Sequence, residues 1–166
     1  MAGLTNGYIQ QLMWSISPQP PKFKGTYPCD IFLASVKENK YKFQKGDCFI
    51  VNLSSSNHRG SHFVCLYLKS KNKAEYFDPM GLSLHIDSNI SQAINISGWE
   101  TSELAKKIQD DGSQFCGLFC LSYLLCRQVG ISVEDFAKLF VKEDLVRNNC
   151  IALEIIKIFI EENCCL

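Results

Sequence analysis

The chain has 166 residues, nearly half of them hydrophobic, and its 17 lysines and arginines equal its 17 aspartates and glutamates. This length and composition predict one globular domain over residues 1–166, with a core that needs neither disulfides nor metal. The balanced charge excludes a broad basic field that would attract nucleic acid or a membrane surface.

The nine cysteines are an odd number, so they cannot all pair within the chain. They are spread through apolar segments, and no secretory leader pattern precedes them. We therefore expect a reducing intracellular compartment. No apolar run approaches the roughly 20 residues that a spanning helix needs, so no membrane partner is expected.

The first third of the chain contains a short helix and a buried strand. The apolar spacing of residues 8–14 predicts a helix, which the proline-rich segment 17–21 ends. Residues 23–30 contain glycine and proline, and we interpret them as a rigid connection that holds aromatic side chains against the body. Residues 47–53 are rich in β-branched and aromatic side chains, which predicts a strand.

Two further strands, 61–68 and 74–78, are joined by about five polar residues, a length that predicts an antiparallel hairpin. Proline 79 ends the second strand because it cannot donate to the ladder. His62 opens the first strand and Asp78 closes the second. Since antiparallel pairing brings the start of one strand beside the end of the next, we expect both side chains at the same rim of the sheet.

The last half of the chain is expected to be mainly helical. Residues 82–101 carry no decisive pattern, and residues 102–108 suit either a helix or a short strand; the strand is favoured because it would hold Gln109 rigidly. Ser132 and Asn148 are candidate helix caps. Helical patterns cover residues 116–129, 133–141 and 148–160. Strands grouped before the main helix predict an α+β fold whose central mixed or antiparallel sheet packs against that helix.

The segment Gln109–Cys120 (QDDGSQFCGLFC) changes from polar and turn-rich to apolar at Phe115. This change predicts a loop that enters a buried helix and places the Cys116 thiol at the helix N-terminus. Free backbone N–H groups and the helix dipole there favour a thiolate, which is the nucleophilic form of cysteine. The plainer interpretation is a buried core cysteine, and only partner residues elsewhere in the chain decide against it.

A cysteine nucleophile needs a base, a group that orients the base, and donors for the oxyanion. His62 is the candidate base and Asp78 the orienting carboxylate, because both are expected at one rim. Gln109 lies seven residues before Cys116 across a tight turn, so its amide can fold back towards the thiol. Each residue taken alone is more often structural; the combination favours catalysis.

The pattern Gln-x-x-x-Ser-x-x-Cys-Gly-Leu-Phe-Cys at 109–120 resembles the nucleophile segment of adenain, the adenovirus endopeptidase family. Residues 60–63 (GSHF) resemble the histidine strand of that family, residues 76–81 (YFDPMG) its acidic strand end, and residues 23–27 (FKGTY) its N-terminal segment. The order histidine, acid, glutamine, cysteine is shared with the wider clan that includes the Ulp-type SUMO proteases. The similarity covers most of residues 23–126.

The resemblance implies a papain-like, Ulp-type cysteine protease architecture and an enzymatic role for each candidate residue. Cys116 is then the nucleophile, His62 the general base and acid, Asp78 the orienting carboxylate and Gln109 the oxyanion donor. The family is a viral thiol endopeptidase that cleaves capsid and core precursors after glycine. It further implies peptide substrates with glycine-containing sites, a monomer, and a location in the host nucleus, the cytoplasm or the virion.

Three departures limit what the resemblance carries over. Asp78 stands where adenain has glutamate, and Phe63 stands where it has tryptophan. No cysteine near Gly98 matches the one that links adenain to its activating peptide. The missing cysteine and the balanced charge give no support for a peptide or DNA activator, so we expect no cofactor and no nucleic-acid partner, while an activating peptide is left open.

Two alternatives remain at this stage. A protease for ubiquitin or SUMO tails would share the chemistry and differ in the surfaces that bind substrate. A cysteine-rich interaction module that holds zinc would be a different class. No cysteine pair has the usual CxxC spacing, and Cys116 and Cys120 lie four apart on an apolar helix, so core packing explains Cys120 better and no metal site is expected.

Overall fold

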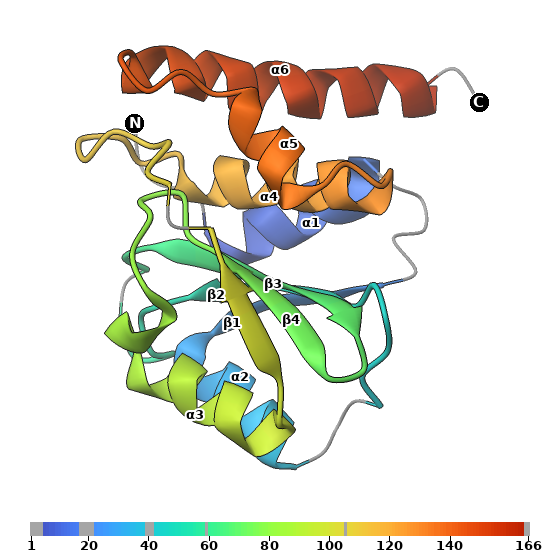
Figure 1. Cartoon of the computed structure of the whole chain (residues 1–166), viewed down its shortest axis with the longest axis vertical. Helices are drawn as coiled ribbons and strands as arrows, with labels where there is room; N and C mark the ends of the chain where they lie inside the picture. Colours follow the sequence, from blue (N-terminus) through green and yellow to red (C-terminus); the bar gives the residue numbers. More distant parts are fainter. Residues whose placement is uncertain (1–4, 17–21, 39–41, 59, 105, 165–166) are drawn as a thin grey trace.

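The computed structural model describes residues 5–16, 22–38, 42–58, 60–104 and 106–164. Strands in the middle of the chain alternate with helices and are followed by a helical C-terminal part (Figure 1). In chain order the elements are α1 (Asn6–Ile16), β1 (Phe23–Pro28), α2 (Cys29–Lys37), β2 (Cys48–Asn52), β3 (Phe63–Ser70), β4 (Lys73–Phe77), the short 3₁₀ helix η1 (Leu84–Ile86), α3 (Ser88–Ser97), β5 (Glu100–Glu103), α4 (Cys116–Gln128), α5 (Val133–Lys138) and α6 (Leu145–Cys164). The predicted α+β class is confirmed.

The sheet is mixed, with the strand order β1-β2-β3-β4-β5. Strand β1 runs parallel to β2, and β4 runs parallel to β5. The central pairs β2–β3 and β3–β4 are antiparallel, which confirms the predicted hairpin. Because the register pairs Cys65 with Phe77, the start of β3 and the end of β4 lie at one rim of the sheet.

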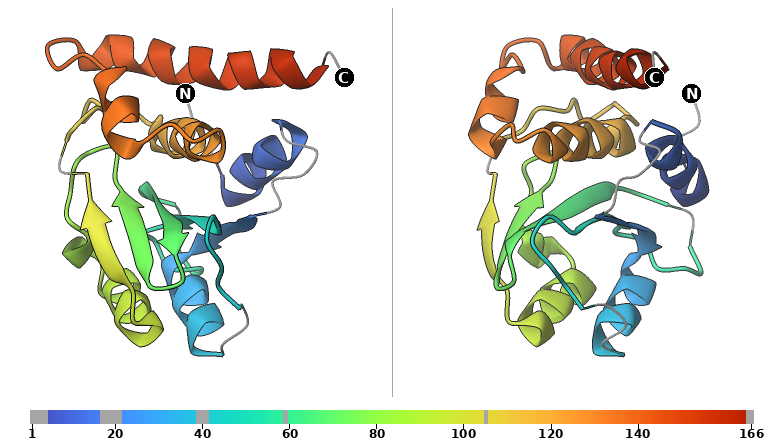
Figure 2. Two further views of the ribbon diagram at one scale, coloured as in Figure 1. Left: turned by 45° about the vertical axis from the view of Figure 1, so that its right-hand side comes forward. Right: turned by 90° about the vertical axis from the view of Figure 1, so that its right-hand side faces the viewer.

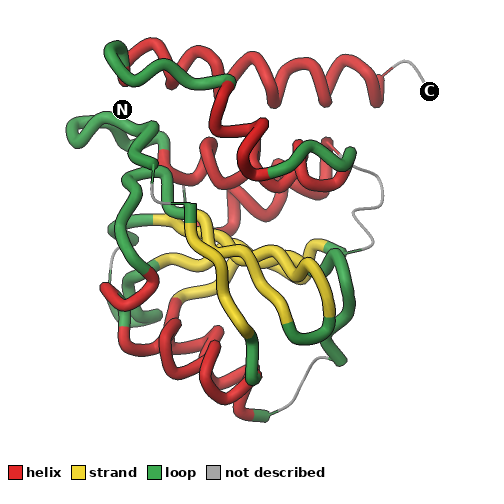
Figure 3. The backbone as a smooth tube through the Cα atoms, viewed as in Figure 1, coloured by secondary structure: helices red, strands yellow, loops and turns green. Residues whose placement is uncertain are grey.

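Helices cover both faces of the sheet (Figures 1 and 2). Helices α2 and α3 lie on one face, and α1, α4, α5 and α6 lie on the other, with α6 outermost. Figure 3 shows the same layering, with the strands between two groups of helices. Residues of β2 are buried on both faces, which explains its continuous apolar sequence.

The prediction that residues 23–30 form a rigid connection is wrong. Residues Phe23–Pro28 form the edge strand β1, and α2 begins directly after Pro28. The sequence of β1 lacks the alternation of buried and exposed residues that is typical of a strand. Gly25 has a positive φ of 136°, and the register with β2 shifts between Phe23 and Gly25. Pairing with β2 supplies the order that local propensity does not.

Residues 82–101, which carry no decisive pattern, contain η1, α3 and the start of β5. The Asp87 carboxylate accepts hydrogen bonds from the N–H groups of Asn89 and Ile90 and begins α3. Gly98, at a φ of 67°, ends it. The strand predicted at 102–108 is corrected, since β5 already ends at Glu103.

The two terminal helices also differ from the expected bounds. Ser132 caps α5 as predicted, with its hydroxyl accepting from the N–H of Asp135, but α5 ends at Lys138. Helix α6 begins at Leu145, so the expected cap Asn148 lies inside it. The N–H of Arg147 instead donates to Asp144 at 2.9 Å. The proline-rich segment 17–21, predicted to end the first helix, lies outside the described residues.

Helix α4 is the central helix of the larger core, because all its residues from Cys116 to Cys126 are buried. It packs between the sheet and α6 (Figure 1). The Cys120 Sγ lies 3.3 Å from the carbonyl oxygen of Phe63, and the ring of Tyr123 stacks on Phe77 with centroids 4.5 Å apart. These contacts set the depth and rotation of α4, and therefore the position of its first residue. In the described part of the chain no helix is long and apolar enough to cross a membrane.

Candidate active site

The Cys116 thiol lies at the N-terminal end of α4, as the change of character in the sequence predicts. The N-cap residue, Phe115, makes no side-chain cap, so no side chain competes for the first-turn N–H groups. Cys116 is 7% exposed, and it lines a groove of about 960 Å³ at the surface. The thiol is thus packed against the core on one side and reaches the groove on the other.

His62 and Asp78 are brought together at the rim of the sheet. His62 precedes β3 and Asp78 follows β4, and the His62 Nε2 lies 2.7 Å from the Asp78 Oδ1. The same carboxylate oxygen accepts a 2.7 Å hydrogen bond from the N–H of Met80. Asp78 is 1% exposed, so it is a fixed, buried acceptor for the imidazole.

Cys116 lines the same groove as His62, and its thiol is close enough to contribute to the raised pKa of the imidazole. Because Nε2 binds Asp78, Nδ1 is the ring nitrogen left for Cys116. Burial lowers the pKa of His62, but the hydrogen bonds and charges of Asp78 and Cys116 outweigh burial and raise this pKa to about 9. The imidazole is therefore held in its charged form between two acidic partners.

Gln109 lies in the loop between β5 and α4 and lines the same groove as His62 and Cys116. Its side chain is 1% exposed, and its Nε2 donates to the carbonyl oxygen of Ser113 at 2.7 Å. An amide nitrogen carries two N–H groups, so one remains for a ligand. Within the described residues, Gln109 Oε1 and Asp78 Oδ2 are buried oxygens with no hydrogen-bond partner.

The strand expected to hold Gln109 is absent, and backbone bonds from the loop perform that task. The N–H groups of Ile108 and Gln109 both donate to the carbonyl oxygen of Pro79, at 2.9 and 3.0 Å. Proline 79 follows Asp78 directly, so the segment that carries the glutamine is tied to the segment that carries the carboxylate.

Asn148 of α6 also anchors this loop, a role that the sequence did not reveal. Its side chain is fully buried and donates 2.9 Å hydrogen bonds to the carbonyl oxygens of Ile108 and Val141, while it accepts from the N–H of Val141. An asparagine near a helix start is usually a cap, and this one instead binds backbone 40 residues away in sequence. Its only sequence signal is a polar residue at a buried helical position.

Several segments line the groove. The segment before α4 contributes Gln109 and residues 111–114 beside Cys116. The β2–β3 loop contributes serines and His58, and the start of α1 also lines the groove. His62 and Met80 complete this lining. The candidate residues therefore face an open depression that has room for a peptide segment.

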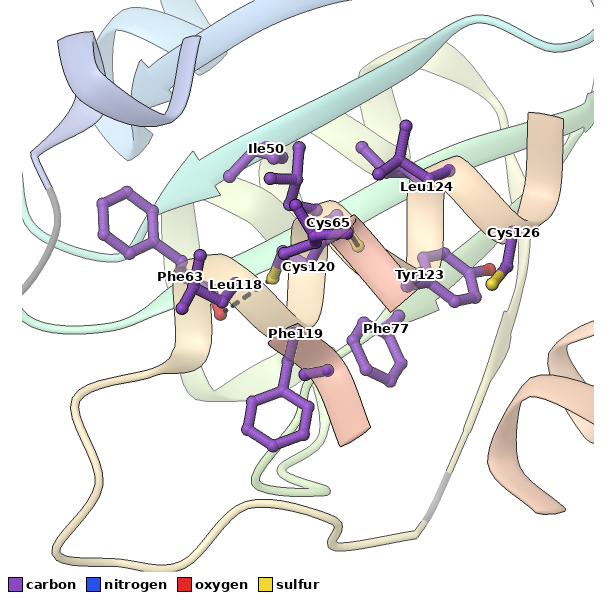
Figure 4. Close-up of a cluster of buried hydrophobic side chains, with 14 of the residues drawn as sticks. Ile50, Phe63, Cys65, Phe77, Leu118, Phe119, Cys120, Tyr123, Leu124 and Cys126 are labelled. Carbon is purple, nitrogen blue, oxygen red and sulfur yellow. Dashed lines mark hydrogen bonds between the residues drawn. The ribbon is translucent and has the colours of Figure 1, made fainter. Parts of the chain in front are cut away.

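A zinc site finds no support in the residues that the structure describes, where no group of three histidine, cysteine, aspartate or glutamate side chains is placed to hold a metal. Cys120 is fully buried, and burial raises its pKa well above the usual value. Its sulfur packs against Phe63 and Cys65 in the core (Figure 4). The cysteines nearest to Cys116 are thus core residues.

Fold and geometry together define an α+β protein in which a thiol, an imidazole and a buried carboxylate are gathered at one groove. No protein-family model matches the sequence, and no curated protein sequence matches it. Among solved structures, the chain resembles AvrA in the structure titled "AvrA delL154 with IP6, CoA", with a TM-score of 0.53 and 20% identity over 84% of this chain and 53% of that chain. The chain thus spans about half the length of that AvrA chain.

A second solved structure matches along almost the whole chain. It is the central domain of the uncharacterized Lpg1148 protein from Legionella pneumophila, with a TM-score of 0.54 and 12% identity over 97% of this chain and 99% of that one. Identities this low show a shared fold and nothing finer. Neither structure is described as an adenovirus endopeptidase, so the likeness to adenain rests on the sequence motifs alone.

Proposed function

We propose that this chain is a cysteine endopeptidase with the triad Cys116, His62 and Asp78. The observation that carries the proposal is the imidazole of His62, which is hydrogen bonded to a buried carboxylate and shares one groove with a thiol at a helix N-terminus. A histidine with a purely structural role needs neither a carboxylate nor a thiol as its neighbour. The groove beside the thiol supplies the space in which a peptide can meet it.

In this mechanism the proton of the Cys116 thiol is held on Nδ1 of His62, as the raised pKa of that ring favours, and the thiolate attacks a peptide carbonyl carbon. The C–N bond breaks as the imidazolium returns the proton to the leaving amine, which leaves a thioester on Cys116. Neutral His62 then takes a proton from water and the resulting hydroxide attacks the thioester carbon. The C–S bond breaks, a carboxylic acid is released, and the proton on His62 is again shared with the Cys116 sulfur. Asp78 orients the ring and stabilises its charged form throughout.

The oxyanion formed at each attack is stabilised by two donors. One is the backbone N–H of Cys116, which belongs to the first turn of α4, where N–H groups lack an intrahelical acceptor. The other is the second N–H of the Gln109 side chain, whose first N–H is fixed on Ser113. Prior fixation lowers the cost of orienting the donor during the reaction.

The substrate class follows from the resemblance to adenain. We propose precursor proteins of the capsid and core type, cleaved after glycine at sites of small residues. The enzyme is then a monomer that acts in a reducing nuclear, cytoplasmic or virion environment, with peptide substrates and no metal. An activating peptide is compatible with this proposal, whereas the balanced charge argues against a nucleic-acid activator.

A quenched fluorescent peptide with a central Gly-Gly bond tests the activity. Wild-type protein is expected to cleave it after glycine, and the Cys116→Ala variant to leave it intact. Equal rates for the two proteins contradict the proposal. A parallel assay on ubiquitin and SUMO conjugates separates a precursor endopeptidase from a protease for modifier tails, since only the latter prefers the folded conjugate to the peptide.

Acyl transfer is a second candidate, favoured by the likeness to the AvrA structure, whose title names CoA. The same thiolate can attack a thioester carbonyl and pass the acyl group to an amine in place of water. Incubation with acetyl-CoA and detection of an acetyl group on Cys116 by mass spectrometry tests this candidate. An acetylated Cys116 together with an uncleaved Gly-Gly peptide would favour the transferase over the protease.

A further inference from the structure

The β2–β3 loop forms a wall of the groove that also holds Cys116, through residues 54–56, 58, 60 and 61, and the proposed mechanism does not use it. The described residues of this loop that line the groove are mostly serines together with His58. His58 is exposed at the groove and is one of only three histidines in the chain. Polar side chains in the same groove as a nucleophile are candidates for binding the substrate.

This wall is held in position by buried or anchored side chains. Asn52, 3% exposed at the end of β2, accepts hydrogen bonds from the N–H groups of Ser54 and Ser61 at 2.9 and 3.3 Å, which closes the base of the loop. The carboxylate of Asp30 on α2 accepts from both the N–H and the hydroxyl of Ser56, at 2.8 and 2.6 Å. The loop is therefore formed before any ligand arrives.

The loop also fixes the His58 ring. Ser55 Oγ lies 2.8 Å from the Nδ1 of His58, and the N–H of His58 donates to the carbonyl oxygen of Ser55 at 3.0 Å. No described residue hydrogen bonds the other ring nitrogen, Nε2. One nitrogen thus orients the imidazole from within the loop, and the other is left for a ligand in the groove.

We propose that His58 is a specificity-determining residue whose Nε2 hydrogen bonds the main chain of an extended peptide on the acyl side of the bond that Cys116 attacks. This inference rests on the proposed function. The neighbouring groups on the wall are short hydroxyls, which reach a peptide only when its backbone lies close to them. A backbone offers both carbonyl acceptors and N–H donors, so either tautomer of His58 finds a partner.

The test compares two reagents for Cys116. One is the peptide acetyl-Ala-Ala-Gly-Gly with a vinyl methyl ester in place of its carboxylate, which spans about 13 Å when extended. The other is iodoacetamide, which is too small to follow the wall. The ratio of the two alkylation rates is expected to fall about fivefold in His58→Ala, the effect of one net hydrogen bond. His58→Gln, whose amide reaches a similar position, is expected to restore the ratio.

His85→Ala is the matched control, because His85 is an exposed histidine on η1 outside the groove, and its ratio is expected to equal that of wild type. An unchanged ratio in His58→Ala, or a fall that His58→Gln does not reverse, overturns the inference. Failure of iodoacetamide to modify Cys116 before the other thiols contradicts the proposed function instead. In that case calorimetry in Cys116→Ala protein, with the unreactive amide of the same tetrapeptide, still decides: equal affinity with and without His58 overturns the inference.

Discussion

The imidazole of His62 and the carboxylate of Asp78 meet at 2.7 Å, although they lie 16 residues apart and belong to neither regular strand. The β3–β4 register brings the two strand ends together, and the Met80 N–H holds the carboxylate from behind. The pairing of His62 with Asp78 therefore follows from the hairpin geometry. The charge state of the imidazole determines whether it holds the proton of the neighbouring Cys116 thiol.

The first prediction concerns the titration of His62. Its folded pKa of about 9 exceeds the ordinary value, because Asp78 and Cys116 favour the charged ring more than burial opposes it. The ring proton signals of His62 should therefore titrate near pH 9 in an NMR experiment, with His58→Gln and His85→Gln variants assigning the other two histidines. A midpoint at or below about 6.5, the value of an unperturbed histidine, would contradict this arrangement.

The same shift has a consequence for stability. A raised folded pKa stabilises the native state fully at pH values below the unfolded pKa of about 6.5, and this contribution is lost as the pH rises through about 9. Wild type should therefore lose stability relative to His62→Ala between these pH values, by at most about 3 kcal/mol. Urea unfolding at a series of pH values measures the free energy of unfolding of both proteins. If the stability of wild type relative to His62→Ala increased with pH, the prediction would be contradicted.

The second prediction separates the charge of Asp78 from its geometry. Asp78→Asn keeps an oxygen for the hydrogen bonds of His62 and Met80, and it removes the negative charge. We expect kcat to fall about tenfold and the titration of His62 to move to lower pH, whereas His62→Ala should lower kcat by about 10² to 10⁴-fold, the usual range for a lost acid and base. If Asp78→Asn proved as damaging as His62→Ala, the carboxylate would have a role beyond orientation.

The sequence allowed prediction of the elements whose signal is local. The strands around residues 47–53 and 61–78 and the helix from Cys116 follow from apolar patterns, and proline and glycine mark their ends. The predictions failed for the edge strand β1 and for the loop that carries Gln109. Pairing with β2 fixes the strand, and hydrogen bonds to Pro79 and from α6 fix the loop. Asn148 could not be found because its partners lie 7 and 40 residues away and only the fold brings them together.

The third prediction tests the oxyanion donor. Gln109→Glu preserves the size and shape of the side chain and removes both N–H groups, including the one that donates to Ser113. We expect kcat to fall about 10²-fold or more while KM changes little, since the donor acts mainly on the tetrahedral intermediate. Steady-state kinetics on the Gly-Gly peptide measure both constants. A rise in KM at constant kcat would assign Gln109 to substrate binding instead.

The fourth prediction concerns a buried ionic cluster at the opposite end of α4. The Glu75 carboxylate, 3% exposed, accepts 2.8 Å hydrogen bonds from the Arg127 Nε and the Tyr123 hydroxyl and lies 3.1 Å from the Lys69 Nζ. Removing Glu75 leaves a mostly buried guanidinium without its carboxylate. Glu75→Leu should therefore reduce the free energy of unfolding by about 3 to 5 kcal/mol, as measured with urea.

The matched variant is the double replacement Glu75→Leu with Arg127→Leu, which removes both charges. It should be less destabilised than the sum of the two single variants, because neither charge is then left buried without a partner. Arg127 lies eleven residues along α4 from Cys116, or about 16 Å at 1.5 Å per residue, so alkylation of Cys116 by iodoacetamide should keep its wild-type rate in folded protein. Additive losses of stability would show that the carboxylate and the guanidinium do not depend on one another, despite their 2.8 Å contact.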